Sequence, residues 1–370
     1  MNKIAKRLEK VELSDVRKIF EVTNKNSINL GIGEPDFDVP ENVKLRMIQG
    51  LEKGFTKYTS NKGCIELREE ISKKLKMDNC VHVDSQSIMV TAGASEALYI
   101  ATQSLVNKGD EVLIPDPGFL SYKACVELSE GNPIPVKIRF ENDYKMKYEE
   151  VQDKLSSKTK AIILNSPSNP TGAVMDKEDI KAIADLSIDH DFIIISDEIY
   201  EKIIYKGKHY SPAQFSDNTI LINGFSKTYA MTGLRVGYLT GPNYLIEEML
   251  KVHQYNTACV SSISQLGAYE ALKGPQKYIE NLVKEFKRRK DLILNGLDDL
   301  GLEHTNVQGA FYVFPKVKNT DDYLKKASKS GVIMVPGSGF GLSCENNIRI
   351  SYATSYENIQ EAINRLKNIL

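Results

Sequence analysis

The amino-acid sequence predicts an α/β protein in which helices cover both faces of a mostly parallel sheet and a smaller α+β domain follows. Short runs that are apolar on both faces alternate with amphipathic helical segments through the middle of the chain, which is typical of buried parallel strands. From about Gly274 onward, a long charged helical segment and scattered strand-like runs replace this alternation. With 370 residues, of which 41% are hydrophobic, the chain is long enough for a large core and two domains.

Each predicted strand is a short apolar run bounded by turn residues, and each predicted helix is an amphipathic segment between such runs. In the larger domain, strands are predicted at 88–91, 111–114, 161–164, 192–196 and 219–222, with helices through 96–101, 122–128 and 176–188. In the smaller domain, helices are predicted over 278–297 and 356–370, with strands at 310–314, 332–335 and 348–351. A helix near 15–22 is expected to pack with them, so the predicted domains are 35–273 and, together, 1–34 with 274–370.

The composition excludes several classes of partner. Lys and Arg total 48 against 49 Asp and Glu, a formal net charge of -1, so no field of one sign favours nucleic acid or an anionic membrane. The five cysteines are widely spaced and form no Cys-x-x-Cys pair, which favours reduced thiols over a disulfide framework or a zinc site. The first residues lack the apolar core of a signal peptide, and no apolar run is long enough to span a bilayer. We therefore expect a soluble cytoplasmic protein without a metal site.

Lys227 is the first candidate for chemistry. It lies in the run Gly224–Gly237, directly after the predicted strand at 219–222, and Arg235 follows it in the same run. A lysine that is desolvated or close to another cation loses its proton readily, and the neutral amine condenses with a carbonyl group. Arginine offers a fixed fork of donors for a phosphate. Because a lysine in a turn is far more often a solvated charge, this interpretation depends on other residues.

The other predicted strands of the larger domain also end in residues with chemical capacity, and ligands of open α/β sheets bind beyond those ends. The small residues 92–95 precede a helix whose N–H groups could bind a phosphate, although a tight turn capped by Ser95 has the same pattern. Phe119 could cover a flat ring or plug the core. Asn169, in the turn Asn-Pro-Thr-Gly, could donate to a phenolate oxygen. Asp197 would need a cation such as a protonated pyridine nitrogen, unless it caps a helix.

Together these stretches resemble the class I and II aminotransferases of the aspartate aminotransferase kind, which are fold-type I pyridoxal-phosphate enzymes. The resemblance covers nearly the whole chain. It rests on Gly31–Phe37, Tyr58–Glu69, Ser168–Gly172, Ser196–Tyr200, the run around Lys227, and Asn347–Thr354. The resemblance implies a mixed, mostly parallel seven-stranded sheet, a pyridoxal 5'-phosphate cofactor and a homodimer with shared active sites.

The same resemblance implies roles around the cofactor ring. Lys227 would form the imine with the cofactor and move the proton between the substrate α-carbon and the cofactor. Asp197 would keep the pyridine nitrogen protonated, so that the ring withdraws charge from the carbanion. Tyr200 and Asn169 would hydrogen-bond the ring oxygen, and Phe119 would stack on the ring.

It also implies how the phosphate and the substrate are held. The phosphate would bind Arg235, Ser226 and the N–H groups of Ala94 and Ser95. Tyr58 would reach the phosphate from the other subunit, although it could equally be a core tyrosine. Arg349 would pair with the substrate α-carboxylate, assisted by the Gly33 N–H and Asn169, although a surface ion pair is the alternative for this arginine.

The predicted activity is a ping-pong aminotransferase reaction between an L-amino acid and a 2-oxo acid, with aspartate and 2-oxoglutarate as the first pair. Aromatic amino acids and alanine are the alternatives, since Tyr122, Tyr255 and Phe340 could line an apolar pocket. Two residues depart from the family pattern. Gly224 stands where many relatives carry serine, so one phosphate contact is expected to be missing. Leu234 stands where tryptophan is common, and we expect no change in the chemistry.

Three other functions share part of this sequence pattern. A C–S β-lyase or a decarboxylase could use the same lysine and cofactor, although a carboxylate held by Arg349 argues against decarboxylation. A transcription regulator with this fold would carry a basic winged-helix segment before Gly31. The residues before Gly31 are expected to be too few for such a domain. Nucleotide binding through Gly337–Gly341 lacks a P-loop lysine and a strand-turn-helix context, so a flexible turn near the site is expected there.

Overall fold

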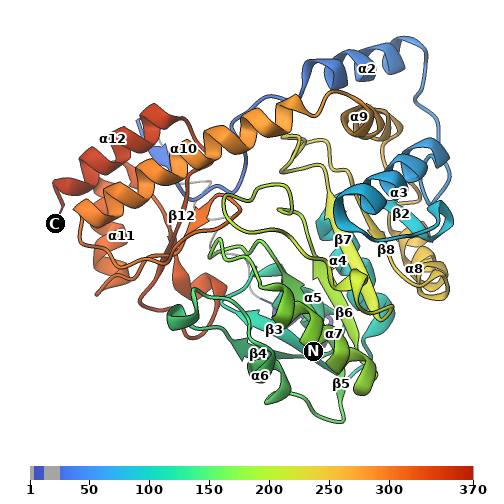
Figure 1. Cartoon of the computed structure of the whole chain (residues 1–370), viewed down its shortest axis with the longest axis horizontal. Coiled ribbons are helices and arrows are strands. Elements are labelled where there is room, and N and C mark those ends of the chain that lie inside the picture. Colours follow the sequence, from blue (N-terminus) through green and yellow to red (C-terminus); the bar gives the residue numbers. More distant parts are fainter. Residues whose placement is uncertain (1–3, 12–25, 370) are drawn as a thin grey trace.

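The computed structural model describes residues 4–11 and 26–369, so the helix predicted near 15–22 lies outside the described residues. A large open sheet with helices on both faces occupies one side of the molecule, and a smaller group of short strands and helices occupies the other (Figure 1). The helix α10 (Lys277–Asp299) runs across the two groups. Within the described part of the chain, no helix combines the length and apolarity needed to cross a membrane.

The large sheet has seven strands, and its mixed, mostly parallel pairing confirms the predicted fold class. β8 runs antiparallel to both of its neighbours, β2 and β7, whereas the remaining pairs are parallel. In spatial order the strands are β2 (Ile88–Thr91), β8 (Gly237–Thr240), β7 (Thr219–Gly224), β6 (Ile193–Asp197), β5 (Thr159–Asn165), β3 (Glu111–Asp116) and β4 (Asn132–Lys137).

β4 and β8 were not predicted. β4 contains Pro133 and Pro135 and lies at the edge of the sheet, where a strand tolerates proline because one side needs no backbone donors. β8 begins with Gly237 and has apolar side chains only at Tyr238 and Leu239, so it lacks the continuous apolar run that marked the other short strands.

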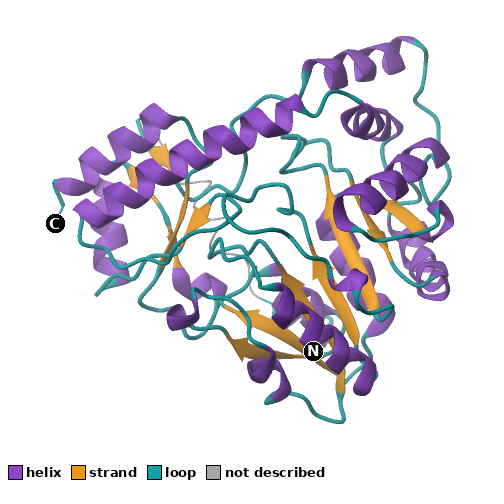
Figure 2. Ribbon diagram, in the orientation of Figure 1, coloured by secondary structure: helices purple, strands orange, loops and turns teal. Residues whose placement is uncertain are grey.

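Alternate residues of the central strands pack under different helices, because successive side chains of a strand point to opposite faces. In β5, Ala161 and Ile163 belong to the core on one face, and Ile162 and Leu164 to the core on the other. The first face is covered by α4 (Ala94–Leu105), α5 (Ser121–Leu128) and α8 (Asn243–Asn256). The opposite face is covered by α6 (Tyr148–Gln152), α7 (Lys177–Asp189), α3 (Ile65–Asn79), α9 (Ser262–Lys273) and, above α9, α2 (Glu41–Glu52) (Figure 2).

The C-terminal group contains two small sheets. β12 (Ile348–Ser351) pairs antiparallel with β9 (Tyr312–Val313) and β11 (Val335–Pro336), and β1 (Ile28–Asn29) pairs parallel with β10 (Val332–Ile333). The strand predicted at 332–335 is therefore two strands, because the chain changes sheets at Met334. The strand predicted at 310–314 is shorter than expected. The helices α11 (Thr320–Lys329) and α12 (Tyr356–Lys367) pack with α10 around these strands.

α10 contributes to both cores. Ile279, in its first turn, packs under the β2 end of the large sheet, whereas Phe286 and Ile293 pack with the C-terminal strands. The division into domains at residue 273 therefore stays a prediction. Short 3-10 helices lie at Lys6–Leu8, Ser85–Ser87, Phe140–Asn142, Pro212–Gln214 and Gly337–Phe340.

Candidate active site

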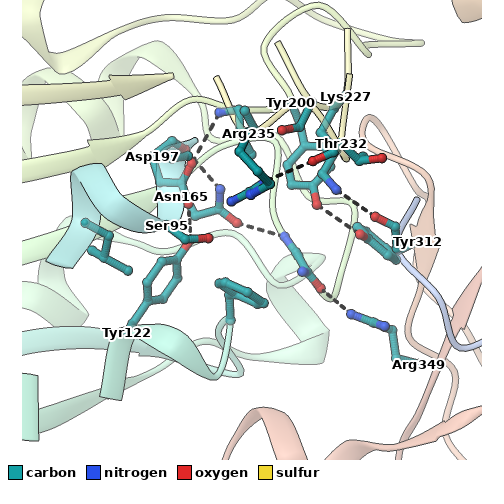
Figure 3. A pocket seen from close by; sticks show the side chains of 17 residues that line it. Ser95, Tyr122, Asn165, Asp197, Tyr200, Lys227, Thr232, Arg235, Tyr312 and Arg349 are labelled. Atoms are coloured by element: carbon teal, nitrogen blue, oxygen red, sulfur yellow. Dashed lines mark hydrogen bonds between the residues drawn. The ribbon is translucent and has the colours of Figure 1, made fainter. Parts of the chain in front are cut away.

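A cavity of about 230 Å³ lies beyond the carboxyl ends of the parallel strands, where their loops meet the C-terminal strands (Figure 3). Every predicted site residue except Tyr58 lines it. The lining residues are Gly33, Ala94, Ser95, Leu98, Phe119, Tyr122, Asn165, Asn169, Asp197, Ile199, Tyr200, Ser226, Lys227, Thr232, Arg235, Tyr312 and Arg349.

Asp197 is the last residue of β6, and burial raises the pKa of its carboxyl group to about 6. The Tyr122 hydroxyl donates to Asp197 Oδ2 at 2.8 Å, and the Ile199 N–H donates to Oδ1 at 3.3 Å. Residues 199–202 form turns and no helix follows directly, so the alternative that Asp197 caps a helix is wrong. A desolvated carboxylate at the floor of a cavity suits a ligand that brings a positive charge.

Lys227 follows the end of β7 and points into the same cavity (Figure 3). Its amino group donates to the Gly33 carbonyl oxygen at 2.7 Å. Burial, with Arg235 and Arg349 nearby, lowers the pKa of this amine to about 8, although Glu34 opposes the shift. A substantial fraction of the amine is therefore neutral near physiological pH, as a nucleophile or base requires. The alternative of a solvated lysine is wrong.

The start of α4 and Arg235 together form a cup of donor groups that suits an anion. The helix begins at Ala94 after the N-cap Gly93, so the alternative that Ser95 caps it is wrong. First-turn N–H groups have no acceptor within their own helix, which leaves those of Ala94 and Ser95 available to a ligand. Arg235 lies beside them, donating to Ala92 O at 3.2 Å. A Cβ on Gly93, whose φ is +83°, would lie 2.6 Å from Arg235 Nη2, so only glycine allows this approach.

Ser226, the fourth predicted phosphate ligand, also lines the cavity. Gly224, the first departure from the family pattern, has a close-packing reason in this fold. A Cβ at Gly224 would lie 3.1 Å from the Gly237 Cα and 3.2 Å from Ile199 Cδ1, because β7 and β8 approach each other here. Leu234, the second departure, is half-buried and packs against the core under α3 and α9.

Arg349, on β12, is buried with 3% of its surface exposed, so the alternative of a surface ion pair is wrong. Its guanidinium donates to Asn169 Oδ1 at 3.1 Å and to Gly31 O at 2.5 Å. Its Nε is buried and has no hydrogen-bond partner among the described residues. A buried donor without a partner is costly, so this nitrogen suits an acceptor brought by a ligand.

Aromatic rings fix the orientation of Arg349. Its guanidinium carbon lies 4.8 Å from the centre of the Tyr312 ring and 4.7 Å from that of Phe340. The Tyr312 and Tyr200 hydroxyl oxygens are 2.9 Å apart, and burial raises the pKa of both phenols. Tyr312 therefore connects Arg349 with Tyr200, which is predicted to hydrogen-bond the ring oxygen of the cofactor.

Not all aromatic candidates meet at the cavity. Tyr58 is 90% exposed, so the alternative of a core tyrosine is wrong, and Tyr255 is 88% exposed and does not line the cavity. Phe340 does not line the cavity either; its ring packs against the Arg349 guanidinium. Phe119 lines the cavity and is half-buried, so it does not merely plug the core.

Sequence reasoning missed several lining residues. Asn165 accepts the Asn169 N–H at 2.8 Å and donates to Asp197 O at 2.9 Å, so it ties two predicted residues together. Asn165 could have been predicted as a site residue from its position at the end of the strand β5. Thr232 lies in the run around Lys227 but received no role, whereas Tyr312 comes from a segment whose position depends on the tertiary fold, and no local pattern marks it.

Comparisons with known proteins agree with this geometry. The chain matches the aminotransferase class I and II family over residues 25–366. A probable aspartate aminotransferase of Methanocaldococcus jannaschii is 48% identical over 376 residues, which cover 99% of each chain. Aromatic-amino-acid aminotransferase 2 of Thermococcus litoralis is 40% identical over 99% of this chain and 98% of its own. The solved structure of the Thermus thermophilus aspartate aminotransferase with maleate has a TM-score of 0.95 and 34% identity, covering 100% of both chains.

Proposed function

We infer that this chain uses pyridoxal 5'-phosphate to move an amino group from an L-amino acid to a 2-oxo acid by a ping-pong mechanism. The chain belongs to the class I and II aminotransferase family and is an aminotransferase. One observation carries the proposal. Lys227 and Asp197 face the same cavity with opposite pKa shifts, to about 8 for the amine and about 6 for the carboxyl group, beside a cup for a phosphate.

The donor set of the cavity fits this cofactor. The amides of Ala94 and Ser95, with Arg235 and Ser226, suit its phosphate, and the desolvated Asp197 suits its pyridine nitrogen. Tyr200 and Asn169 would hydrogen-bond the ring oxygen, and Phe119 would cover the ring. When bound, the cofactor supplies an electron sink for the negative charge that develops on the substrate α-carbon.

The residues of this chain supply the proton transfers and the orientation. The Lys227 amine, neutral above about pH 8, would take the proton from the substrate α-carbon and pass it to the bound cofactor, and it would reverse this transfer in the second half of the reaction. The Asp197 carboxylate would stabilise a proton on the ring nitrogen of the bound cofactor by its negative charge. Arg349, with its unpaired Nε, binds the substrate α-carboxylate and fixes which bond is broken.

For the substrates we propose aspartate and 2-oxoglutarate. The names of relatives such as the probable aspartate aminotransferase of M. jannaschii support this pair. An aromatic amino donor is the second candidate, because the described cations that line the cavity are Lys227, Arg235 and Arg349, which all have other roles. A panel of amino donors with 2-oxoglutarate would separate the two, and release of pyruvate and ammonia without an acceptor would indicate a β-lyase.

We further propose a homodimer in the cytoplasm. Leu45, Ile48 and Leu51 are 50%, 51% and 55% exposed on one stripe of α2, an apolar surface that a second subunit would cover. Tyr58, at 90% exposure, lies beyond the same helix and would reach the partner's phosphate. The free cysteines support a reducing compartment.

Replacing Lys227 by alanine tests the reaction class. The Lys227→Ala protein should fold and bind the cofactor, and it should lose both the absorbance of the lysine-bound cofactor and nearly all transamination. Lys251→Ala, at an exposed position of α8, is the control and should keep both. Full turnover by Lys227→Ala would end the proposal.

A further inference from the structure

Behind the phosphate cup lies a buried carboxylate that the proposed mechanism does not use. Glu96, the third residue of α4, is 8% exposed. Its Oε2 accepts the Ala92 N–H at 2.5 Å. Its Oε1 accepts from Asn256 Nδ2 at 3.0 Å and from the Thr257 hydroxyl, and it lies 3.2 Å from His253 Nδ1. The carboxylate therefore joins the start of α4 to the end of α8.

Ala92 is held on both sides of its α-carbon. Glu96 binds its N–H, and Arg235 Nη2 binds its carbonyl oxygen at 3.2 Å. Arg235 and the amides of Ala94 and Ser95 are the groups that the proposed function assigns to the phosphate. The conformation of Ala92 therefore sets how these groups converge.

A carboxylate this close to a phosphate site would repel the ligand unless its charge were compensated. Glu96 lies in the first turn of α4, where the helix dipole favours a negative charge. Burial alone would raise the pKa of Glu96, but hydrogen bonds with His253, Ala92 and Thr257 lower it to about 2. The group is therefore ionised at physiological pH, and it is surrounded by donors.

We propose that Glu96 is a positioning residue for the cofactor phosphate, which it does not touch. It holds Ala92 so that Arg235 and the first-turn amides of α4 point at one anion. This inference rests on the proposed function. The competing view is that Glu96 only fastens α4 to α8, in which case its loss would weaken every ligand of the cavity alike.

Glu96→Gln separates these views, because glutamine keeps the size of the side chain and offers one acceptor oxygen instead of two. Cofactor-free protein is titrated with pyridoxal 5'-phosphate and with pyridoxal, which carries the same ring and aldehyde without the phosphate. We expect the Kd of the phosphorylated form to rise about tenfold, which corresponds to about 1.4 kcal/mol, and that of pyridoxal to change less than about twofold. Equal weakening of both ligands, or no change in either, would overturn the inference.

Three controls keep the outcomes distinct. Wild-type protein that bound neither ligand would refute the proposed function instead of the role of Glu96. Gln103→Ala removes a hydrogen bond of α4 to Ser129 Oγ, 2.8 Å long, without touching Ala92, and should leave both constants unchanged. If Glu96→Gln does not fold, Thr257→Val removes one donor to Glu96. It should weaken the phosphorylated ligand selectively by about threefold, and an equal effect on both ligands would again refute the inference.

Discussion

Replacement of Lys227 by methionine should stabilise the cofactor-free protein, because the buried ammonium destabilises the fold. Its pKa is about 8 in the folded protein against an ordinary value of 10.5, and each unit of difference corresponds to about 1.4 kcal/mol. The amine therefore costs the folded state about 3 kcal/mol where it is protonated in both states. The variant also loses the 2.7 Å hydrogen bond to Gly33 O, worth about 1 kcal/mol, so the expected net gain is about 2 kcal/mol.

The gain has a defined pH dependence. The folded protein releases the Lys227 proton near pH 8, and the unfolded chain holds it up to pH 10.5, so the unfolded state binds more protons between these values. Wild-type stability should therefore rise with pH across this window. The advantage of the variant should be complete below pH 8 and should shrink as the pH rises; above about pH 10.5 only the loss of about 1 kcal/mol from the missing hydrogen bond to Gly33 O should remain.

The assay is urea unfolding of the cofactor-free proteins at pH 7 and at pH 10.5. Lys251→Met, at a side chain that is 67% exposed, is the matched control and should change the free energy of unfolding by less than about 0.5 kcal/mol. Two results would refute the reasoning: a Lys227→Met protein no more stable than wild type at pH 7, or a gain that is equally large at pH 10.5.

Two further predictions concern binding and stability. Arg349→Lys should raise the KM for the amino donor at least about tenfold with a smaller change in kcat, because a point charge cannot replace a planar fork of donors; unchanged kinetics would remove Arg349 from the site. Lys74→Met should lower the free energy of unfolding by about 3–5 kcal/mol at pH 7, since it leaves the Glu201 carboxylate buried without its ammonium, whereas Lys73→Met at an exposed position of the same helix should not. Because the pKa of Glu201 is lowered to about 2, the stabilisation is complete above about pH 4.5 and lost as the pH falls toward 2, so acid unfolding should remove the difference between Lys74→Met and wild type.

The central strands could be predicted because burial on both faces makes them apolar throughout. β5 and β6 pair as neighbours and pack under helices on each side, so their central residues, 161–164 and 193–195, form uninterrupted apolar runs. The edge strand β4 could not be predicted, since its prolines and exposed residues resemble a loop. The break between β10 and β11 was also invisible, because it depends on which partner strand each half meets.

The site could be predicted where each chemical group directly follows a strand. Asp197 ends β6 and Lys227 follows β7, and parallel strands bring their carboxyl ends to one edge of the sheet. Tyr312 could not be assigned in this way, because its contact with Tyr200 joins residues far apart in the sequence. The family resemblance, confirmed by the match over residues 25–366, supplied roles that no local pattern contains.

The segment after β6 shows why sequence alone could not choose among its carboxylates. Asp197, Glu198 and Glu201 lie within five residues, and each could serve a cationic ligand. In the structure only Asp197 faces the cavity. Glu198 Oε2 instead lies 2.8 Å from His209 Nε2, and Glu201 is paired with Lys74.

The buried charged residues of this segment that face away from the cavity also affect Asp197. Side-chain atoms of Glu198, Glu201 and His209 that could bind a metal ion lie within 4.8 Å of one another. The Lys74 ammonium, which pairs with Glu201, already provides a positive charge at this place. Burial is the main cause of the raised pKa of Asp197, and the charge of Glu198 raises it further. The buried network around Glu198 and Glu201 thus fixes the turn that follows β6. It also increases the affinity of Asp197 for a proton, or for a protonated ring nitrogen placed beside it.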